Sequence, residues 1–372
     1  PRCLAASLPR CLAASLPRSS REHMESSEEN VVDSRILYSI GSGRALSTDG
    51  QLYNPTGLAF DGRRDLLAVV DGWNHRLQVF AATDGSFIDK LGSKQQLAYP
   101  HGIAFDHERG TVLVIDTDND RIQSWSLTER RLLSVLGKRG AGEREFHCPK
   151  AVAIDERHHR VLIADDFNHR VQVLSSRDLS FLFSLGTGKQ GKQPGEMYRP
   201  AGVAVDCERD RTIVSDTENN RMQVFSSIDG SFLFEFGWSG TEAGQLDRPR
   251  GVCLDNQGRI IVADSGNCRL QAFTHEGHHI SSFEWSEACP LAVAFDEHRG
   301  LIAFSADNRV RVIGANQWLP NTFTWRPDRH RYAPSWIKQA VEVMTMIRSV
   351  VDDSASMSMI PNELLFEIFS FL

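Results

Sequence analysis

The sequence predicts an all-β protein, a six-bladed β-propeller, and a repeated motif is the main reason. The pattern Asp-x-x-Asn-x-Arg-apolar-Gln occurs five times, and its copies begin at Asp71, Asp116, Asp165, Asp216 and Asp264. A Pro-x-x-apolar-x-apolar-Asp segment precedes each copy, and a sixth, degenerate unit runs from Pro290 to Arg309. The units recur every 41–51 residues, a period that is typical of propellers and solenoids.

A second observation is that each unit contains four short runs rich in β-branched or aromatic residues. Examples of the first to fourth runs are Gly57–Phe60, Thr111–Ile115, Arg170–Leu174 and Phe181–Gly186. Gly, Pro and Asp separate them, as expected for strands joined by tight turns. Each unit therefore predicts one four-stranded blade.

A third observation concerns how the ring closes. The first five units each contain a fourth strand, but no matching segment follows Val312. A matching segment, Ile36–Gly41, lies before the first unit. We therefore expect the propeller to span residues 34–316, with the N-terminal strand completing the sixth blade so that only short edges remain.

The repeated Asp and Arg predict a structural ion pair rather than a catalytic one. Asp71 ends a strand and Arg76 begins the next one, so the two residues face each other across a hairpin. The Asn between them tolerates the left-handed backbone of such a turn. A catalytic site would not be copied into every blade.

These motifs resemble those of NHL-repeat six-bladed propellers over about residues 35–314. Gly-rich connectors that run into the next Pro also match, as between Gly137 and Pro149 and between Gly186 and Pro200. Some relatives of this family are zinc-dependent amidating lyases, and some NHL propellers of tripartite-motif ubiquitin ligases bind RNA on the connector face. The resemblance therefore leaves three kinds of function to compare: protein binding, RNA binding and catalysis.

The catalytic hypothesis depends on the channel mouth, where the residue after each blade's Pro is expected to lie. These residues are Thr56, His101, Lys150, Ala201, Arg250 and Leu291. A zinc site needs about three convergent ligands, and only one of the six is His. We therefore expect no metal, no cofactor and no enzymatic activity, and a propeller lyase or hydrolase is the least favoured reading.

The binding hypotheses depend on the connectors of blades 3 and 4. They predict a binding face that contains Lys138, Arg139, Arg144, Phe146, Lys150, Lys189, Lys192, Tyr198, Arg199 and Trp238. The aromatic residues could stack on RNA bases. The net charge of −7, however, opposes a global electrostatic attraction for nucleic acid. The leading hypothesis is a protein-binding scaffold, the substrate-recognition part of a ubiquitin ligase, and RNA binding on this face is the alternative.

The two ends of the chain differ from the propeller. Residues 1–33 contain the octapeptide PRCLAASL twice and predict a disordered or artefactual tail. Residues 317–334 read as a linker, and residues 335–372 predict a helical segment. Its last part resembles the opening helix of an F-box through Pro361, Leu364, Leu365, Ile368 and Phe369. This resemblance implies a Skp1-type adaptor as partner, and the alternative is an amphipathic helix that folds back on the propeller.

Composition is that of an ordinary globular chain, with 41% hydrophobic and 24% charged residues. No apolar run reaches the length of a membrane span. The seven cysteines form neither a CxxC pair nor a zinc spacing. We therefore expect a cytoplasmic protein whose thiols, Cys253 and Cys268 among them, are buried and reduced.

Overall fold

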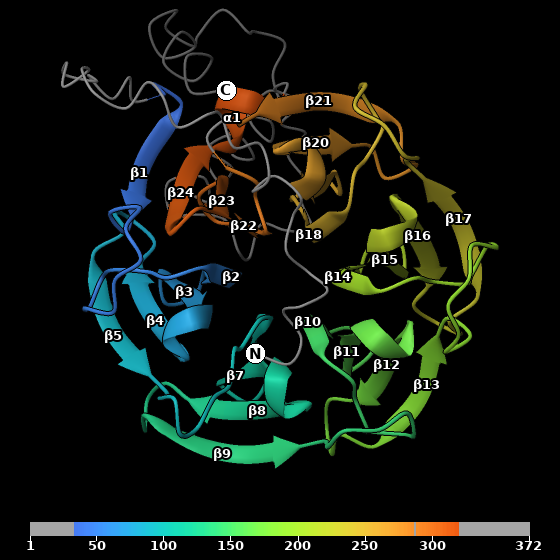
Figure 1. Ribbon diagram of the computed structural model, residues 1–372, viewed down its shortest axis with the longest axis horizontal. Coiled ribbons are helices and arrows are strands. Elements are labelled where there is room, and N and C mark those ends of the chain that lie inside the picture. Colours follow the sequence, from blue (N-terminus) through green and yellow to red (C-terminus); the bar gives the residue numbers. More distant parts are fainter. Residues whose placement is uncertain (1–32, 286–287, 320–372) are drawn as a thin grey trace, which may run out of the picture. The chain divides into compact units, whose positions relative to one another are not determined.

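The computed structural model describes residues 33–285 and 288–319, and within them it shows six four-stranded antiparallel sheets. The sheets are arranged as blades around a central axis, as Figure 1 shows. The innermost strand of each blade lies next to the axis and the fourth strand forms the circumference. The predicted all-β, six-bladed propeller is therefore confirmed.

Blades 1 to 3 follow one another along the chain. Blade 1 contains β2 (Pro55–Asp61), β3 (Leu66–Asp71), β4 (Arg76–Ala81) and β5 (Phe87–Leu91). Blade 2 contains β6 (Ile103–Asp106), β7 (Thr111–Asp116), β8 (Arg121–Ser126) and β9 (Arg131–Leu136). Blade 3 contains β10 (Pro149–Asp155), β11 (Arg160–Asp165), β12 (Arg170–Ser175) and β13 (Phe181–Leu185).

Blades 4 to 6 complete the ring. Blade 4 contains β14 (Pro200–Asp206), β15 (Arg211–Asp216), β16 (Arg221–Ser226) and β17 (Phe232–Phe236). Blade 5 contains β18 (Pro249–Leu254), β19 (Ile260–Asp264), β20 (Arg269–Phe273) and β21 (His279–Glu284). Blade 6 contains β22 (Ala292–Asp296), β23 (Leu301–Ala306), β24 (Arg309–Gly314) and β1 (Ile36–Ile40).

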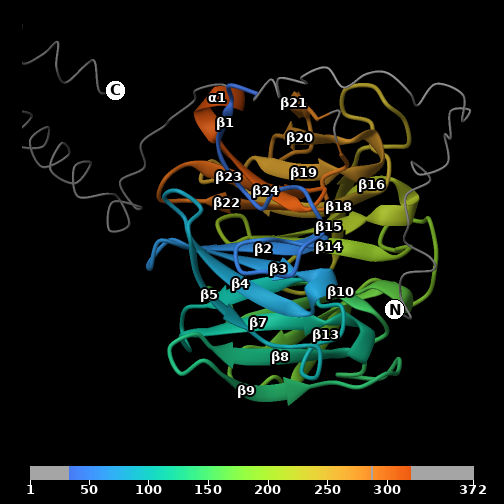
Figure 2. The same ribbon diagram turned by 60° about the vertical axis from the view of Figure 1, so that its left-hand side comes forward.

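The N-terminal strand closes the ring as the sequence predicts. Strand β1 pairs antiparallel with β24, and Ile40 lies opposite Val310. The buried Ile40 packs into the cluster between blades 6 and 1, and the Tyr38 hydroxyl donates a hydrogen bond to the Ala82 carbonyl oxygen (2.6 Å). In Figures 1 and 2, the blue β1 lies beside the orange β24. Chain segments from both ends therefore hold one sheet together.

The repeated Asp is the centre of a hydrogen-bond network in five blades. Asp165 is fully buried and accepts hydrogen bonds from the His147 backbone N–H and from the side chains of Asn168, Arg170 and Gln172 (2.8, 2.9, 3.1 and 3.3 Å). Burial raises the pKa of Asp165, and these donors act in the opposite direction. Between Asp165 and Arg170 lies the single-turn 3-10 helix η5 (Asp166–Asn168).

The same motif also fastens the incoming connector to its blade. Arg170 Nη2 donates to the carbonyl oxygens of Gly142 and Glu145 (2.7 and 3.1 Å), and the Asn168 side chain donates to that of Gly140 (2.8 Å). Equivalent bonds recur at η3 (Gly72–Asn74), η6 (Thr217–Asn219) and η7 (Ser265–Asn267). The turn η4 (Thr117–Asn119) occupies this position in blade 2. The connectors and these turns therefore lie at the same end of the propeller.

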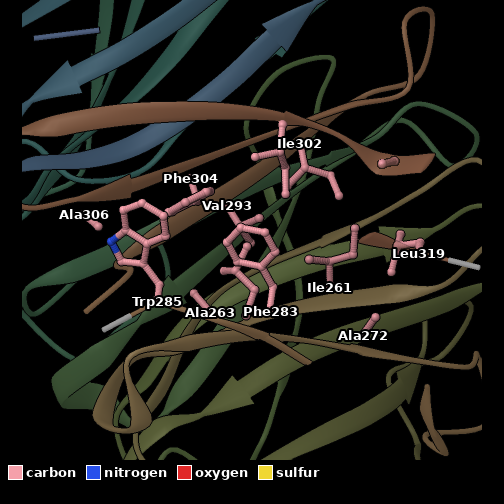
Figure 3. Close-up of a cluster of buried hydrophobic side chains, with 13 residues drawn as sticks. Ile261, Ala263, Ala272, Phe283, Trp285, Val293, Ile302, Phe304, Ala306 and Leu319 are labelled. Atoms are coloured by element: carbon pink, nitrogen blue, oxygen red, sulfur yellow. The ribbon is translucent and has the colours of Figure 1, made fainter. Parts of the chain in front are cut away.

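The cores lie between neighbouring blades. Figure 3 shows the cluster between blades 5 and 6, where Phe283 and Phe304 meet edge to face at 5.9 Å between ring centroids. Trp285, Ile302 and Leu319 pack into the same cluster. Packing on both faces explains why the middle strands are nearly continuous in apolar residues.

The cysteines depart from prediction. A disulfide joins Cys268 to Cys289, so the prediction of a reduced Cys268 is wrong for this structure. Cys207 and Cys253 are free thiols, and Cys253 is partly buried. Residue Cys268 has the left-handed backbone conformation (φ 52°) that ends η7, and Cys289 precedes the Pro of blade 6.

The other five blade junctions explain why these two positions meet. At each one, the residue before Pro donates its backbone N–H to the side chain of the residue that precedes the third-strand Arg in the preceding blade, as Tyr99 does to His75 Nδ1 (2.9 Å). The other four donors are Asn54, Cys148, Arg199 and Arg248. The disulfide thus takes the place of a repeated inter-blade hydrogen bond.

After β24, the chain continues into the short helix α1 (Ala315–Trp318), which lies next to blade 6 in Figure 2. The predicted tail (1–33) falls almost wholly outside the described residues. The linker lies outside them from residue 320 onwards. The predicted helical segment (335–372), with its F-box-like residues, lies outside them entirely. In the part of the chain that the structure describes, no helix is long and apolar enough to cross a membrane.

Candidate binding site

The channel mouth gathers the residues that follow the blade prolines. Thr56, His101, Lys150, Ala201, Arg250 and Leu291 all line one cavity of about 110 Å³. The cavity lies at the connector end of the propeller, because Asp166, Thr217 and Glu218 from the turns η5 and η6 also line it. The residue after each blade Pro therefore lines a shared central space, as its place in the repeat suggests.

Close approach of the inner strands shapes this cavity. A side chain at Gly57 would place its Cβ 2.0 Å from the His101 carbonyl oxygen, and one at Gly202 would lie 2.0 Å from that of Arg250. Only glycine fits at these two positions, because the neighbouring backbone occupies the space of any Cβ. The six channel-mouth side chains are thus held on strands packed against one another.

Lys150 is the most unusual group in the cavity. Only 7% of it is exposed, and its Nζ lies 3.2 Å from His101 Nε2. No carboxylate of the described residues forms an ion pair with Lys150, although Asp166 lies near enough to favour its charged form. Burial lowers the pKa of Lys150 to about 8, and Arg250 and Arg199 contribute to the decrease. At neutral pH, the cavity therefore contains a buried ammonium group whose only hydrogen-bond partner in residues 33–285 and 288–319 is an imidazole.

The other cations differ in how they are compensated. Arg199 forms two hydrogen bonds to the Asp166 carboxylate (2.9 and 3.0 Å), and its guanidinium lies 4.4 Å from the centroid of the Phe167 ring. Burial lowers the pKa of His101 well below its usual value, with Lys150 and Arg250 adding to this effect, so the imidazole is neutral at pH 7. Burial also lowers the pKa of Arg250. Lys150 thus lies near two further cations, Arg199 and Arg250, and near the carboxylates of Asp166 and Asp118, neither of which forms an ion pair with it in the described part of the chain.

An aromatic group extends from the cavity towards blade 1. Tyr53 stacks on Trp73 (5.6 Å between centroids), Trp73 meets Tyr99 edge to face (5.2 Å), and Tyr99 meets His101 in the same way (5.2 Å). The Lys150 ammonium lies 6.0 Å from the centroid of Tyr99. This aromatic group was not predicted from the sequence. Tyr53 lies two residues before Pro55, and Tyr99 lies one residue before Pro100. Aromatic residues so close to a blade Pro were the sequence feature that could have indicated it.

The predicted binding face of blades 3 and 4 is only partly accessible. Lys138, Arg139, Arg144, Lys189 and Lys192 are exposed, Tyr198 is partly exposed, and 62% of Trp238 is exposed. Lys138 pairs with Glu145 (3.2 Å), and Arg139 lies 3.0 Å from His147. We call the surface formed by the accessible predicted residues the connector face; it consists of Lys138, Arg139, Arg144, Lys189, Lys192, Tyr198 and Trp238.

Three residues assigned to that face need correction. Phe146 has no exposed surface and packs between blades 2 and 3, so it cannot stack on a base. Lys150 lies in the channel, and Arg199 is paired with Asp166. Phe146 is buried because its connector folds back on itself. The Phe146 backbone N–H donates a hydrogen bond to the Lys138 carbonyl oxygen (2.9 Å).

Metal ligands do not converge in the part of the chain that the structure describes. No group of three or more His, Cys, Asp or Glu side chains there could hold a metal ion. The histidines nearest the channel mouth, His101 and His147, contact Lys150 and Arg139 instead.

Comparison with known proteins identifies the repeats. A family model described as "NHL repeat" matches residues 52–80, 97–124, 197–225 and 246–273. Protein brain tumor of Drosophila melanogaster is 34% identical over 128 residues, which cover 34% of this chain and 11% of that protein. E3 ubiquitin-protein ligase NHLRC1 of Mus musculus is 26% identical over 159 residues, covering 40% of this chain and 39% of that ligase.

Two further comparisons extend the picture. E3 ubiquitin-protein ligase TRIM71 of Xenopus tropicalis is 52% identical over 46 residues, covering 12% of this chain and 6% of that protein. This chain therefore spans less than half the length of each of these relatives. A solved gluconolactonase from Xanthomonas campestris superposes with a TM-score of 0.56 at 15% identity, over 71% of this chain and 86% of that one, and shows the fold alone. The chain is a six-bladed β-propeller in which NHL repeats match blades 1, 2, 4 and 5.

Proposed function

We propose that this propeller is a non-enzymatic scaffold that binds a protein partner through its connector face and channel mouth. The observation that supports this most is the channel mouth, where six neighbouring blades present six different side chains around one cavity. Each of these side chains follows a blade Pro, and the six differ from blade to blade. A rigid frame with variable groups at one end is suited to recognition.

A role in ubiquitin ligation is the more specific part of the proposal. Two of the relatives are named E3 ubiquitin-protein ligases, and this chain matches only part of each. In such a ligase, the propeller would select the protein to be modified, and an adaptor of the Skp1 type would dock elsewhere. The F-box-like segment that suggests this adaptor lies outside the described residues. A cytoplasmic location also stays a prediction. Because disulfides are rare in cytosolic proteins, measuring whether Cys268 and Cys289 are oxidised in the native protein would test it.

RNA binding is the second candidate. The exposed cations Arg139, Lys189 and Lys192 and the exposed ring of Trp238 favour it, because phosphates and bases bind such groups. Against it, acidic side chains such as Glu143 and Glu242 lie exposed on the same connectors. Protein binding is therefore the better-supported candidate.

Charge reversal at the connector face tests the proposal. The variant Arg139→Glu, Lys189→Glu, Lys192→Glu should fold normally and capture less of its partner from RNase-treated lysate. A matched control, Arg63→Glu, Arg157→Glu, Arg177→Glu, reverses three exposed cations on turns at the opposite end. Equal capture by both variants would place the interface elsewhere. Loss of all capture after RNase treatment would instead favour the RNA candidate.

A further inference from the structure

The cavity at the channel mouth contains a cation that no anionic group of the described residues pairs with. The Lys150 ammonium is buried, and its one hydrogen-bond partner within the described part of the chain is the neutral ring of His101 (3.2 Å). Burial of an unpaired charge is costly, and natural proteins pair such groups with a counter-ion. Within the described residues, the nearby carboxylate of Asp166 is already bonded twice by Arg199. The cavity is therefore suited to an anion that comes from outside.

The size and surroundings of the cavity restrict what that anion is. A volume of about 110 Å³ admits one small group, such as a carboxylate with a few methylenes. The Thr56 hydroxyl is already bonded to the Pro100 carbonyl oxygen (2.8 Å), and Ala201 and Leu291 supply apolar walls. Asp166 and Glu218 at the same mouth would repel an extended polyanion. A single carboxylate on a neutral chain meets the local positive charge without that repulsion.

From these observations we propose that the channel mouth binds one carboxylate of a protein partner between Lys150, His101 and Arg250. This inference rests on the proposed protein-binding function and deepens it. The carboxylate oxygens accept hydrogen bonds from the Lys150 ammonium and from Arg250. The rings of Tyr99 and Trp73 provide an apolar surface beside the entering chain. Charge-assisted bonds in a dry cavity are strong enough to anchor a peptide.

Peptide selection tests this assignment and its source. Three pools of random octapeptides without Asp would be offered to the full chain. One has no Glu and a free carboxyl end, one has no Glu and an amidated end, and one is amidated with one internal Glu. We expect the first or the third pool to be enriched over the second. Enrichment of the first pool would identify the bound group as a C-terminal carboxylate, and enrichment of the third would identify it as a Glu side chain. The Lys150→Met variant should lose about tenfold or more in affinity for the best peptide. Lys90→Met, exposed on the outer strand β5, is the matched control.

Proton uptake on peptide binding distinguishes a lysine that contacts the ligand from one that only supports the fold. A lysine that only supports the fold would take up no proton when the peptide binds. A carboxylate bound beside Lys150 raises the pKa of its ammonium group, so binding at pH 8 should take up as much as about half a proton. Titration calorimetry of the selected peptide in two buffers of different ionisation enthalpy measures this uptake. It should vanish in Lys150→Met.

Three outcomes would overturn the inference. The first is equal recovery of all three pools by the wild-type chain, a result that needs no variant. The second is peptide binding without proton uptake and without loss in Lys150→Met. The third is Lys150-dependent binding of a single-stranded RNA pool with no peptide enriched. Partner capture that is independent of Lys150 but sensitive to the connector-face reversal would leave the proposed function standing while removing this inference.

Discussion

Two buried charges in blade 3 differ in how the protein compensates them. Asp165, at the end of β11, accepts hydrogen bonds from four donors, and the same arrangement recurs in four other blades. Lys150, in the neighbouring strand β10, has only the His101 imidazole as a hydrogen-bond partner among the described residues, and its position is occupied by a different residue in every other blade. The repeated charge is satisfied inside the fold, whereas the unrepeated one faces an open cavity. Of these two charges, the repeated one serves the structure and the unrepeated one belongs to the candidate site.

The largest expected effect concerns the segment that makes the repeats into a closed ring. Deleting the chain through Gly41 removes β1, so β24 becomes an exposed edge and the cluster around Ile40 and Val310 loses one side. We expect loss of cooperative folding, measured as a thermal transition by circular dichroism. Leu37→Ser is the control, because Leu37 lies on the same strand but is 49% exposed. A truncated protein that melts within a few degrees of the intact chain would contradict ring closure by β1.

The next effect concerns the disulfide, a departure from the repeat that serves structure. The bond closes a separation of 21 residues, so the constraint on the unfolded chain predicts a contribution of about 3 kcal/mol. The double variant Cys268→Ala, Cys289→Ala should lower the free energy of unfolding by about this amount. The double variant Cys268→Asn, Cys289→Arg copies the Asn220–Arg248 junction and should recover about 1 kcal/mol through one hydrogen bond. Urea denaturation of both variants and of the wild-type chain measures both effects, and an unchanged midpoint in the Ala variant would contradict the prediction.

A smaller loss is expected from breaking one repeated network. Arg170→Ala leaves Asp165 buried with three donors and removes two bonds to the connector of blade 3. The cost should be about 1–3 kcal/mol in the free energy of unfolding. Arg177→Ala, an exposed residue of the same blade, is the control and should change stability by less than about 0.5 kcal/mol. Partner binding that disappears at unchanged stability would make the repeated motif functional instead.

Most of the fold could be predicted because it repeats. The Asp165–Arg170 pairing follows from strand ends that a five-residue spacing places opposite each other, and ring closure follows from counting fourth strands. The six channel-mouth positions follow in the same way from the place of each Pro. Local spacing fixes these features, since each depends on neighbouring strands of one blade.

What could not be predicted depends on how the connectors return to the ring. Phe146 was taken for a surface residue, yet it fills the gap between two blades. Leu52, Leu97, Met197 and Leu246 are equally buried, and each, like Phe146, lies three residues before a Pro. The signal was present as a repeated apolar position. The Cys268–Cys289 disulfide and the Tyr53–Trp73–Tyr99 group carried no repeated apolar position of this kind, because each joins residues that are far apart in the repeat.

The smallest expected effect is a gain in stability, where the earlier variants lose it. It distinguishes the buried charge of Lys150 from that of Asp165 most clearly. Lys150 ionises with a pKa of about 8 in the folded chain, below the usual 10.5 that we expect when unfolded. Between these two values the unfolded chain holds the proton and the folded chain does not, so the stability of the wild-type protein should rise with pH across this window. Below pH 8 the buried ammonium destabilises the fold. Lys150→Met should therefore stabilise the protein at pH 7 by about 1–2 kcal/mol, after allowance for the lost bond to His101.

This gain should shrink above pH 8 and be absent near the pKa of the unfolded lysine, which urea denaturation at pH 7, 8, 9 and 10 would follow. Arg170→Ala should lose stability at every one of these values, because its guanidinium stays charged throughout. A residue whose removal stabilises the protein is retained for something other than the fold, as expected of a binding group. Destabilisation by Lys150→Met at all four pH values would place Lys150 with Asp165 among the structural charges, and repetition would then no longer distinguish the scaffold from the site.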